Sequence, residues 1–188
     1  MIKTLSTRLL KSPDELHDFY RLRYETFVIE QNAAPASLYT DGLLKDDFDN
    51  SAYHIGCFID DELVGCISLV EKNDNCTLMI EKCHDVLLDE NHSYGEVMRL
   101  IIRKCSNTST FGIKARIIGS LFEKIQELVI NKGLTHLFLQ STVSVQKMYE
   151  RLGFKQIGKY KVYKGISNEC PMLLDIEDIN KTIFKEEV

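Results

Sequence analysis

The feature that most constrains the fold is a long amphipathic helix set between two short apolar strands. The helix is expected from about residue 113 to 132, and Gly133 predicts its end. Residues 95–104 before it and 136–142 after it are apolar runs typical of buried strands. The apolar stripe of the helix is formed by Ile117, Leu121, Ile125 and Leu128. This arrangement predicts the central part of an α/β fold.

The N-terminal region adds a strand and a well-marked helix. Residues 3–10 alternate enough to predict a short strand. Ser12, Pro13 and Glu15 supply an N-cap, a proline at the first helical position and a capping-box acid. A helix should therefore begin here and run to about Glu30.

The remaining segments complete a mixed pattern of strands and helices. Residues 31–50 predict a long loop, a feature that in compact domains is usually functional or mobile. The other expected elements are a hairpin (52–59 and 63–71), a helix within 144–154 that Gly153 ends, strands at 155–163 and 170–176, and a charged, peripheral tail (177–188). We predict one mixed sheet in a single domain over residues 1–188, since this length suits one core.

Composition excludes several classes of function. Lys plus Arg is 23 and Asp plus Glu is 28, so the net charge of −5 argues against nucleic-acid binding. No apolar run is long enough to span a membrane, and polar residues interrupt the N-terminus where a signal peptide would need an apolar stretch. We expect a cytoplasmic protein with no membrane span. The six cysteines form no CxxC pair, which predicts reduced thiols without disulfides.

Two constellations of reactive side chains are weak candidates for chemistry. Four possible metal ligands occur in one stretch, but their spacing fits no common zinc pattern, so we predict no metal site. They are Cys76, Cys83, His84 and His92. Cys105 precedes the long helix without a histidine nearby in sequence, and a buried structural thiol is the expected role.

The segment from Glu96 to Phe154 carries a family resemblance. It contains a strand, a polar loop with Gly112, the long helix, another strand and the sequence MYERLGF. This layout resembles the GNAT superfamily of N-acyltransferases. The resemblance implies a GNAT-type (acyl-CoA N-acyltransferase) fold, with a mixed central sheet flanked by helices. It also implies that backbone N–H groups of the strand, near Ile101 and Ile102, polarise the thioester carbonyl.

The resemblance also implies a site for the pyrophosphate of coenzyme A at the start of the long helix. Gly112 and Ile113 would contribute there, because a helix N-terminus offers unpaired N–H groups and a positive dipole to an anion. Lys114 and Arg116 add positive charge in the first turn. The family's glycine pattern is incomplete, with Ser109 where it begins and Lys114 where it ends. An acyl carrier protein is therefore a candidate donor beside acyl-CoA.

The sequence YERLGF matches the end of the GNAT core, and Tyr149 is the position that matters chemically. In the family this tyrosine often protonates the departing thiolate. A phenol with a pKa of about 10 is a plausible acid toward a thiolate whose conjugate pKa is about 8.5. The alternative is a half-buried aromatic side chain that packs on the sheet.

The N-terminal half resembles one GNAT branch, the autoinducer (acyl-homoserine-lactone) synthases and the related N-acyl amino acid synthases. The matching residues are Arg23 and Phe27 on the first helix, Asp46 and Asp49 after the long loop, and Glu96 and Arg99 on the central strand. The resemblance implies that Arg23, Phe27, Asp46, Asp49 and Arg99 bind substrate. Equally, the two arginines and two aspartates could form an ion-pair cluster that orders the long loop over the acceptor site.

Three departures from the lactone synthases bear on the product. Leu44 stands where those enzymes carry a glutamate, Ser68 stands where they carry an arginine, and the chain has no tryptophan for their first helix. These differences argue against lactone formation. An N-acyl amino acid synthase, or an enzyme with another small amine acceptor, fits better.

The expected reaction is acyl transfer from a thioester to a small primary amine. An α-amino group has a pKa near 8 and is mostly protonated at neutral pH, so a base is needed, and Glu96 is the candidate. Two rivals remain open. One is an ordinary acetyl-coenzyme A acetyltransferase, and the other is a catalytically silent module that binds acyl-CoA.

Overall fold

The sheet of the computed structural model mixes parallel and antiparallel strands. The structure describes residues 4–163 and 167–178. Within them the strand order is β1-β2-β3-β4-β5-β8-β6, with β7 paired to β8. The strands are β1 (Leu5–Leu9), β2 (Ala52–Ile59), β3 (Glu62–Glu71), β4 (Tyr94–Ile102), β5 (His136–Thr142), β6 (Lys155–Gln156), β7 (Lys161–Tyr163) and β8 (Ser167–Asp175). β4 and β5 run parallel, whereas β1 with β2 and β5 with β8 run antiparallel. The predicted mixed α/β fold is confirmed.

Helices connect these strands, and the chain divides into two compact units. The helices are α1 (Pro13–Arg23), η1 (Tyr24–Glu30), η2 (Ala36–Leu38), η3 (Asp47–Ser51), α2 (Met79–His84), η4 (Ser106–Thr108), α3 (Phe111–Lys132) and α4 (Gln146–Arg151). The first unit comprises the described residues of Met1–Leu69 and Arg99–Leu128. The second comprises the described residues of Val70–Met98 and Val129–Val188.

In the first unit, α1 begins at the predicted position, and its N-terminus is a capping box. The Glu15 backbone N–H donates to Ser12 Oγ at 3.2 Å, and the Ser12 N–H donates to Glu15 Oε2 at 3.2 Å. Phe19 and Leu22 of the helix are buried in a core cluster. The capping box therefore fixes where the buried face of α1 begins.

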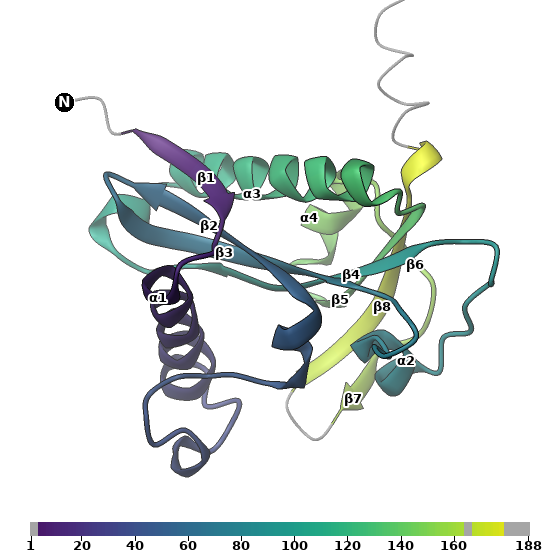
Figure 1. The fold of residues 1–188 in the computed structure, drawn as a ribbon, viewed down its shortest axis with the longest axis horizontal. Helices are drawn as coiled ribbons and strands as arrows, with labels where there is room; N and C mark the ends of the chain where they lie inside the picture. Colours follow the sequence, from purple (N-terminus) through teal and green to yellow (C-terminus); the bar gives the residue numbers. More distant parts are fainter. Residues whose placement is uncertain (1–3, 164–166, 179–188) are drawn as a thin grey trace, which may run out of the picture. The chain divides into compact units, whose positions relative to one another are not determined.

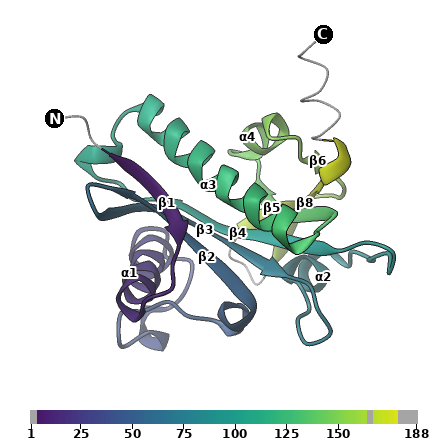
Figure 2. The same ribbon diagram turned by 45° about the horizontal axis from the view of Figure 1, so that its top comes forward.

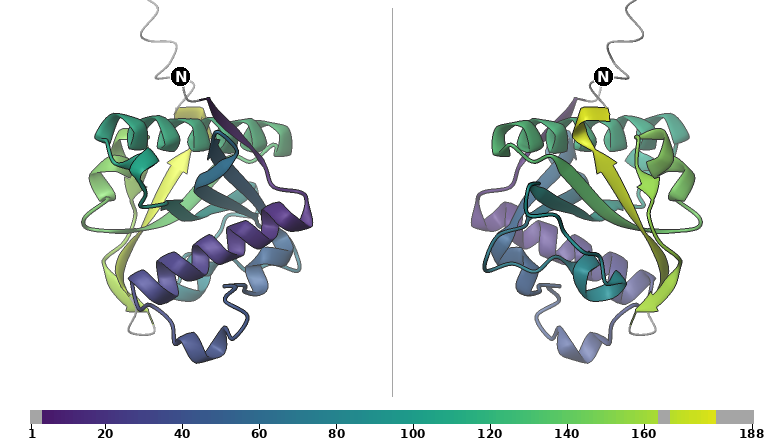
Figure 3. Two further views of the ribbon diagram at one scale, coloured as in Figure 1. Left: turned by 90° about the vertical axis from the view of Figure 1, so that its left-hand side faces the viewer. Right: turned by 90° about the vertical axis from the view of Figure 1, so that its right-hand side faces the viewer.

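Helices cover both faces of β3 in the first unit. Cys66 belongs to the core cluster that includes Phe19 of α1. Its neighbour Gly65 faces α3, because a Cβ atom there would lie 2.8 Å from Ile117 Cγ2. Successive residues of a strand point to opposite faces, so α1 and α3 pack on opposite sides of these strands, as Figures 1 and 3 show.

The second unit has its own core around β5 and β8. In the parallel pairing of β4 with β5, Glu96 lies opposite Phe138, and the Tyr94 ring stacks on Phe138 with centroids 5.4 Å apart. α2 and α4 lie on opposite sides of these strands (Figures 1 and 2). Gly133 and Gly153, predicted to end helices, have the positive φ values of 64° and 95° that favour glycine.

The structure corrects the sequence prediction in three places. The helix expected to run to Glu30 is α-helical only to Arg23 and continues as the π-helical η1. The strand expected at 155–163 is two short strands, β6 and β7. α2 was not predicted, because its six residues are too few to show a helical period. The tail predicted as peripheral lies outside the described residues from 179 onward.

Length and apolar character together decide whether a helix can cross a membrane. None of the helices in the described part of the chain combines the two sufficiently to do so.

The tight approach of α3 to β3 yields a prediction about stability. Gly65→Ala should destabilise the protein by about 1–3 kcal/mol, because the added methyl would overlap Ile117 and lie 3.1 Å from the Ile101 carbonyl oxygen. Gly119→Ala on α3 is the control, since its Cβ would have no neighbour within 4 Å and alanine favours helix. Urea unfolding should show a loss for the first variant alone, and equal effects would contradict this packing.

Candidate active site

A buried ion pair joins the end of α1 to the end of the long loop in the first unit. Arg23 is the last residue of α1, and its side chain is only 1% exposed. Its Nη1 donates to both oxygens of Asp49, at 2.7 Å and 2.9 Å. Its Nη2 donates to Asp46 Oδ2 at 2.8 Å. The buried guanidinium is thus bound by two carboxylates, of which Asp49 is also buried.

Arg99 completes the cluster from β4. Its Nη1 donates to Asp49 Oδ1 at 3.0 Å, and its Nη2 donates to Asp46 Oδ1. Two arginines and two aspartates balance in charge, as buried ions require. Burial opposes ionisation of Asp46, but Arg99 and Arg23 outweigh it and hold its pKa below the usual range. The four charged residues predicted from the family resemblance therefore meet in one place, defined here as the ion-pair cluster.

The two aspartates also shape the loop that carries them. The Asp46 backbone N–H donates to Asp49 Oδ2 at 2.8 Å, and the Phe48 N–H donates to Asp46 Oδ1 at 3.0 Å. Their three-residue spacing makes them a capping box for η3. The loop at 31–50 thus ends in a short helix whose position depends on the cluster.

The backbone of Arg99 is left-handed, with φ of 60° inside β4. Such a conformation is uncommon for a residue with a Cβ atom and costs about 1–2 kcal/mol. A single left-handed residue in a strand is typical of a β-bulge. The ion pairs of the Arg99 side chain hold this backbone feature in place, three residues after Glu96.

His54 and Ser68 support the cluster, and the sequence analysis missed this role for both. His54 Nδ1 lies 3.0 Å from Ser68 Oγ, and its Nε2 lies 3.6 Å from Asp49 Oδ1. With hydrogen on Nε2, a neutral His54 accepts a hydrogen bond from Ser68 at Nδ1, while its Nε2–H faces Asp49 from beyond hydrogen-bond distance. Burial is the main cause that lowers the pKa of His54 to about 4, with Arg99 and Arg23 acting in the same direction and Asp49 opposing them. His54 is therefore neutral at pH 7.

Phe27, the fifth predicted substrate-binding residue, has an apolar environment. It belongs to η1 and packs, partly buried, against the core cluster that contains Phe19. The structure thus brings four of the five predicted substrate-binding residues together and places Phe27 in the apolar layer beside α1.

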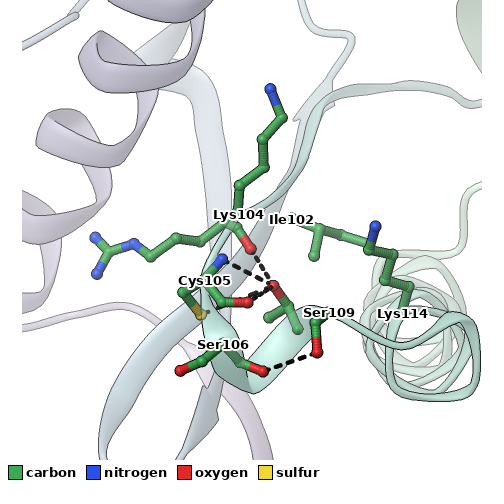
Figure 4. Close-up of a pocket in the computed structure, with 8 residues that line it drawn as sticks. Ile102, Lys104, Cys105, Ser106, Ser109 and Lys114 are labelled. Carbon is green, nitrogen blue, oxygen red and sulfur yellow. Dashed lines mark hydrogen bonds between the residues drawn. The ribbon is translucent and has the colours of Figure 1, made fainter.

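A pocket of about 530 Å³ lies where β4 ends and α3 begins, also in the first unit (Figure 4). Its lining is Ile102, Arg103, Lys104, Cys105, Ser106, Thr108, Ser109 and Lys114. Buried Thr108 closes the loop, because its Oγ1 donates to the Arg103 carbonyl and accepts from the Cys105 N–H at 3.2 Å. Of these residues, only Ile102 and Lys114 were predicted. The polar loop CSNTSTFG was the signal for Cys105, Ser106, Thr108 and Ser109, whereas nothing marked Arg103 and Lys104.

The other residues predicted for coenzyme A lie near this pocket without lining it. Ile101 is a buried core residue, and Arg116 is exposed on α3. The Ile113 N–H donates to Thr110 Oγ1 at 3.3 Å, so Thr110 caps the helix. A Cβ atom on Gly112 would meet nothing within 4 Å, which leaves the first turn of α3 open.

Glu96 lies in the second unit and is only 1% exposed. Its Oε2 accepts a hydrogen bond from the Ile80 N–H at 3.1 Å, and its Oε1 accepts one from Gln140 Nε2 at 3.1 Å. Two N–H donors on a buried carboxylate stabilise its ionised form.

Tyr149 belongs to α4 in the second unit and is buried. Its ring packs edge-on against Phe154, with centroids 6.1 Å apart. Burial, together with Glu169, raises the pKa of Tyr149 to about 12. The phenol is therefore protonated at neutral pH and is a weaker acid than a free tyrosine.

The cysteines and histidines show no arrangement that points to a metal. Within residues 4–163 and 167–178, no three His, Cys, Asp or Glu side chains gather in a group that could hold an ion. All six cysteines lie in this part of the chain, and no disulfide joins them. Cys105, expected to be buried, is half-buried beside the pocket.

Comparison with known proteins identifies the family. A sequence profile described as "N-acyl amino acid synthase FeeM" matches residues 18–176, which is most of the chain. The chain belongs to the FeeM family of N-acyl amino acid synthases. No curated protein sequence matches significantly.

Solved structures show that this FeeM-family chain has the GNAT fold. FeeM, an N-acyl amino acid synthase from uncultured soil microbes, is 22% identical with a TM-score of 0.73, over 94% of this chain and 93% of that one. BjaI, a CoA-dependent acyl-homoserine lactone synthase solved with SAM and isopentyl-CoA, is 14% identical with a TM-score of 0.70, over 92% and 84%. An acyl-CoA N-acyltransferase from Pseudomonas aeruginosa is 16% identical with a TM-score of 0.58, over 92% and 99%.

The activity class follows from the family. The protein is an N-acyltransferase that moves an acyl group from an acyl thioester to an amine. The resemblance to the N-acyl amino acid synthase and autoinducer synthase branch is confirmed.

The buried histidine beside Asp49 predicts how stability depends on pH. The pKa of His54 is about 4 in the folded state against an ordinary value of 6.5, so the unfolded chain binds more protons between these limits. His54 therefore costs no stability above pH 6.5, and its cost grows as the pH falls toward 4. At a pH near 4.5 the loss should be about 2.5 kcal/mol.

The measurement is urea unfolding of the parent and of His54→Gln at pH values near 7.5 and 4.5. Glutamine does not titrate, so the variant should lose less stability on acidification than the parent. An identical loss in both proteins would show that His54 is not buried in its neutral form.

The two aspartates should differ in their importance for stability. Asp49 is 8% exposed and binds both arginines, so Asp49→Asn should cost about 3–5 kcal/mol. Asp46 is 41% exposed, and water can replace part of its role, so Asp46→Asn should cost about 1–2 kcal/mol. Denaturant unfolding of both variants checks this order, and the reverse order would contradict the burial of Asp49.

Proposed function

We propose that the enzyme makes N-acyl amino acids, with a free amino acid as acceptor and an acyl-phosphopantetheine thioester as donor. The match to the FeeM family over residues 18–176 carries this proposal. The departures at Leu44 and Ser68 support it against lactone formation. The match includes residues of both units, so we also propose that they act as one catalytic domain.

The pocket at the start of α3 supports donor binding. A pyrophosphate there would meet the open first turn at Gly112 and the ammonium of Lys114. Figure 4 shows Lys114 extending from α3 on one side, with Cys105 and Ser106 on the other. Lys104 also lines the pocket, and its ammonium pairs with Glu30 at 2.6 Å. This chemistry suits coenzyme A and the same phosphopantetheine group on a carrier protein.

The reaction needs a neutral amine, a polarised carbonyl and a stabilised leaving sulfur. Glu96 takes a proton from the ammonium group of the acceptor, and the freed lone pair attacks the thioester carbon. Backbone N–H groups beyond the left-handed Arg99, near Ile101 and Ile102, stabilise the oxyanion. The C–N bond forms as the C–S bond breaks.

Tyr149 completes this proposal by donating a hydrogen bond to the departing thiolate. Its pKa of about 12 exceeds that of a thiol, about 8.5, so the proton stays mainly on the phenol and the hydrogen bond stabilises the charge. The proton that the attacking nitrogen loses can then neutralise the sulfur.

The ion-pair cluster orders the loop rather than binding the acceptor directly. The Arg23 guanidinium is buried and occupied by two carboxylates, which favours this role. Asp46 is the member open to solvent. Because η3 depends on the cluster, loss of the ion pairs would disorder the loop at 31–50.

Product analysis tests the proposed reaction. The protein is incubated with acetyl, octanoyl and palmitoyl thioesters of coenzyme A and of acyl carrier protein, together with the common amino acids and a set of other amines. Mass spectrometry should detect N-acyl amino acids. Acetyl amides of non-amino-acid amines alone would contradict the proposed acceptor, and thermal stabilisation by a thioester without any product would contradict catalysis.

A single substitution tests the base. Glu96→Gln should lower kcat by about a hundredfold or more, because a positioned general base contributes about that much, while binding of octanoyl-CoA is unchanged. Glu90→Gln, at an exposed position, is the matched control. Both rates are followed as thiol release, and unchanged turnover in Glu96→Gln would remove Glu96 from the mechanism.

A further inference from the structure

A chain of side-chain hydrogen bonds in the second unit ends on Glu96. Gln140 of β5 donates from Nε2 to Glu96 Oε1 at 3.1 Å. On its other side, Gln140 Oε1 lies 3.1 Å from Nε2 of His84, the last residue of α2. The neighbouring Ile80 N–H holds Glu96 Oε2, also at 3.1 Å. Two elements, α2 and β5, thus supply hydrogen-bond partners to one carboxylate.

One end of an amide accepts hydrogen bonds and the other donates them, and this difference fixes the direction of the series of hydrogen bonds. An ionised Glu96 can only accept, so it must face the NH₂ group of Gln140. The carbonyl oxygen of Gln140 then faces His84, whose Nε2 must carry hydrogen in order to donate. Only one tautomer of His84 is compatible with this arrangement.

His84 makes the opposite arrangement unfavourable. Its Nδ1 is buried and has no hydrogen-bond partner in the described part of the chain. If Glu96 were protonated and donated to an inverted Gln140, the hydrogen of His84 would move to Nδ1, where it would have no acceptor. A buried N–H group without an acceptor is rarer in folded proteins than a buried acceptor without a donor, which favours the arrangement with hydrogen on Nε2.

Other groups near His84 do not supply that acceptor. Burial is the main cause that lowers the pKa of His84, so its neutral form dominates at neutral pH. The polar and charged groups that act on His84 are Gln140, Lys161, Glu169 and Asp85. Asp85 is bound by Lys161 at 2.8 Å. His84 therefore acts on Gln140 as a neutral donor.

We propose that His84 and Gln140 are positioning residues that hold Glu96 in its ionised form and fix the direction of its carboxylate. The proposal rests on the proposed role of Glu96 as the base. No family motif quoted above includes either residue. The pair would keep Glu96 ready to accept a proton before the amine arrives. The hydrogen bonds between His84, Gln140 and Glu96 are restored when that proton leaves.

Paired substitutions at His84 separate this role from simple packing. Glutamine places an N–H donor about where Nε2 lies, whereas asparagine reaches only to the position of Nδ1. His84→Gln should keep the hydrogen bond to Gln140, and His84→Asn should lose it. Gln140→Leu removes the donor to Glu96 while keeping a side chain of similar size. A role in packing alone would not distinguish glutamine from asparagine in this way.

The measurement is NMR titration of protein labelled with ¹³C at glutamate carboxyl carbons, with the Glu96 signal assigned by its absence in Glu96→Gln. In Gln140→Leu and His84→Asn, Glu96 should titrate about one pH unit higher than in the parent, since the first removes a donor to the carboxylate and the second removes the donor that orients Gln140. His84→Gln should titrate as the parent does. Thermal unfolding checks that each variant is folded.

The outcomes separate this inference from the proposed function. If Glu96 titrates at the parent pH in both Gln140→Leu and His84→Asn, the inference is overturned whatever the turnover shows. If Gln140→Leu does not fold, the comparison of His84→Asn with His84→Gln still decides. Normal turnover in Glu96→Gln would overturn the base role and, with it, the purpose assigned to the pair, even where the titration shifts as expected.

Discussion

The structure of the first unit depends on the ion pairs of Asp49, whose carboxylate is buried between two guanidinium groups. It accepts from Arg23 at 2.7 Å and 2.9 Å and from Arg99 at 3.0 Å. Removing one partner from such a cluster leaves an uncompensated buried charge, whereas the intact cluster is balanced. His54 lies beside Asp49 in its neutral form and does not disturb that balance, which a third cation would do.

The cluster connects segments that are far apart in sequence. Arg23 ends α1, Asp49 lies in η3, and Arg99 is the left-handed residue of β4. One set of charges therefore fixes the end of a long loop and an unfavourable backbone conformation in a strand. The cost of the left-handed residue is offset by its ion pairs. The same strand carries Glu96, the residue proposed above as the base.

Elements fixed by residues close in sequence could be predicted, whereas contacts between residues far apart in sequence could not. Ser12 and Glu15 cap α1 because their partners are three residues away, and Gly133 ends α3 through its own backbone. Arg23 and Asp49 could be paired only through a family resemblance, since no periodic pattern links them. The roles of His54 and Gln140 were missed, because a single histidine or glutamine carries no motif and its function depends on tertiary neighbours.

Native-state hydrogen exchange on Asp49→Asn measures whether the ion pairs hold both the loop and the backbone at Arg99. If the cluster holds both the loop and the left-handed Arg99, amides in residues 46–51 and in 99–103 should lose protection together, while those of β2 stay protected. The Arg103 N–H, bonded to the Val64 carbonyl at 2.8 Å, is a convenient reporter for the second segment. Loss of protection in 46–51 alone would contradict the claim that the ion pairs hold Arg99 in its left-handed conformation.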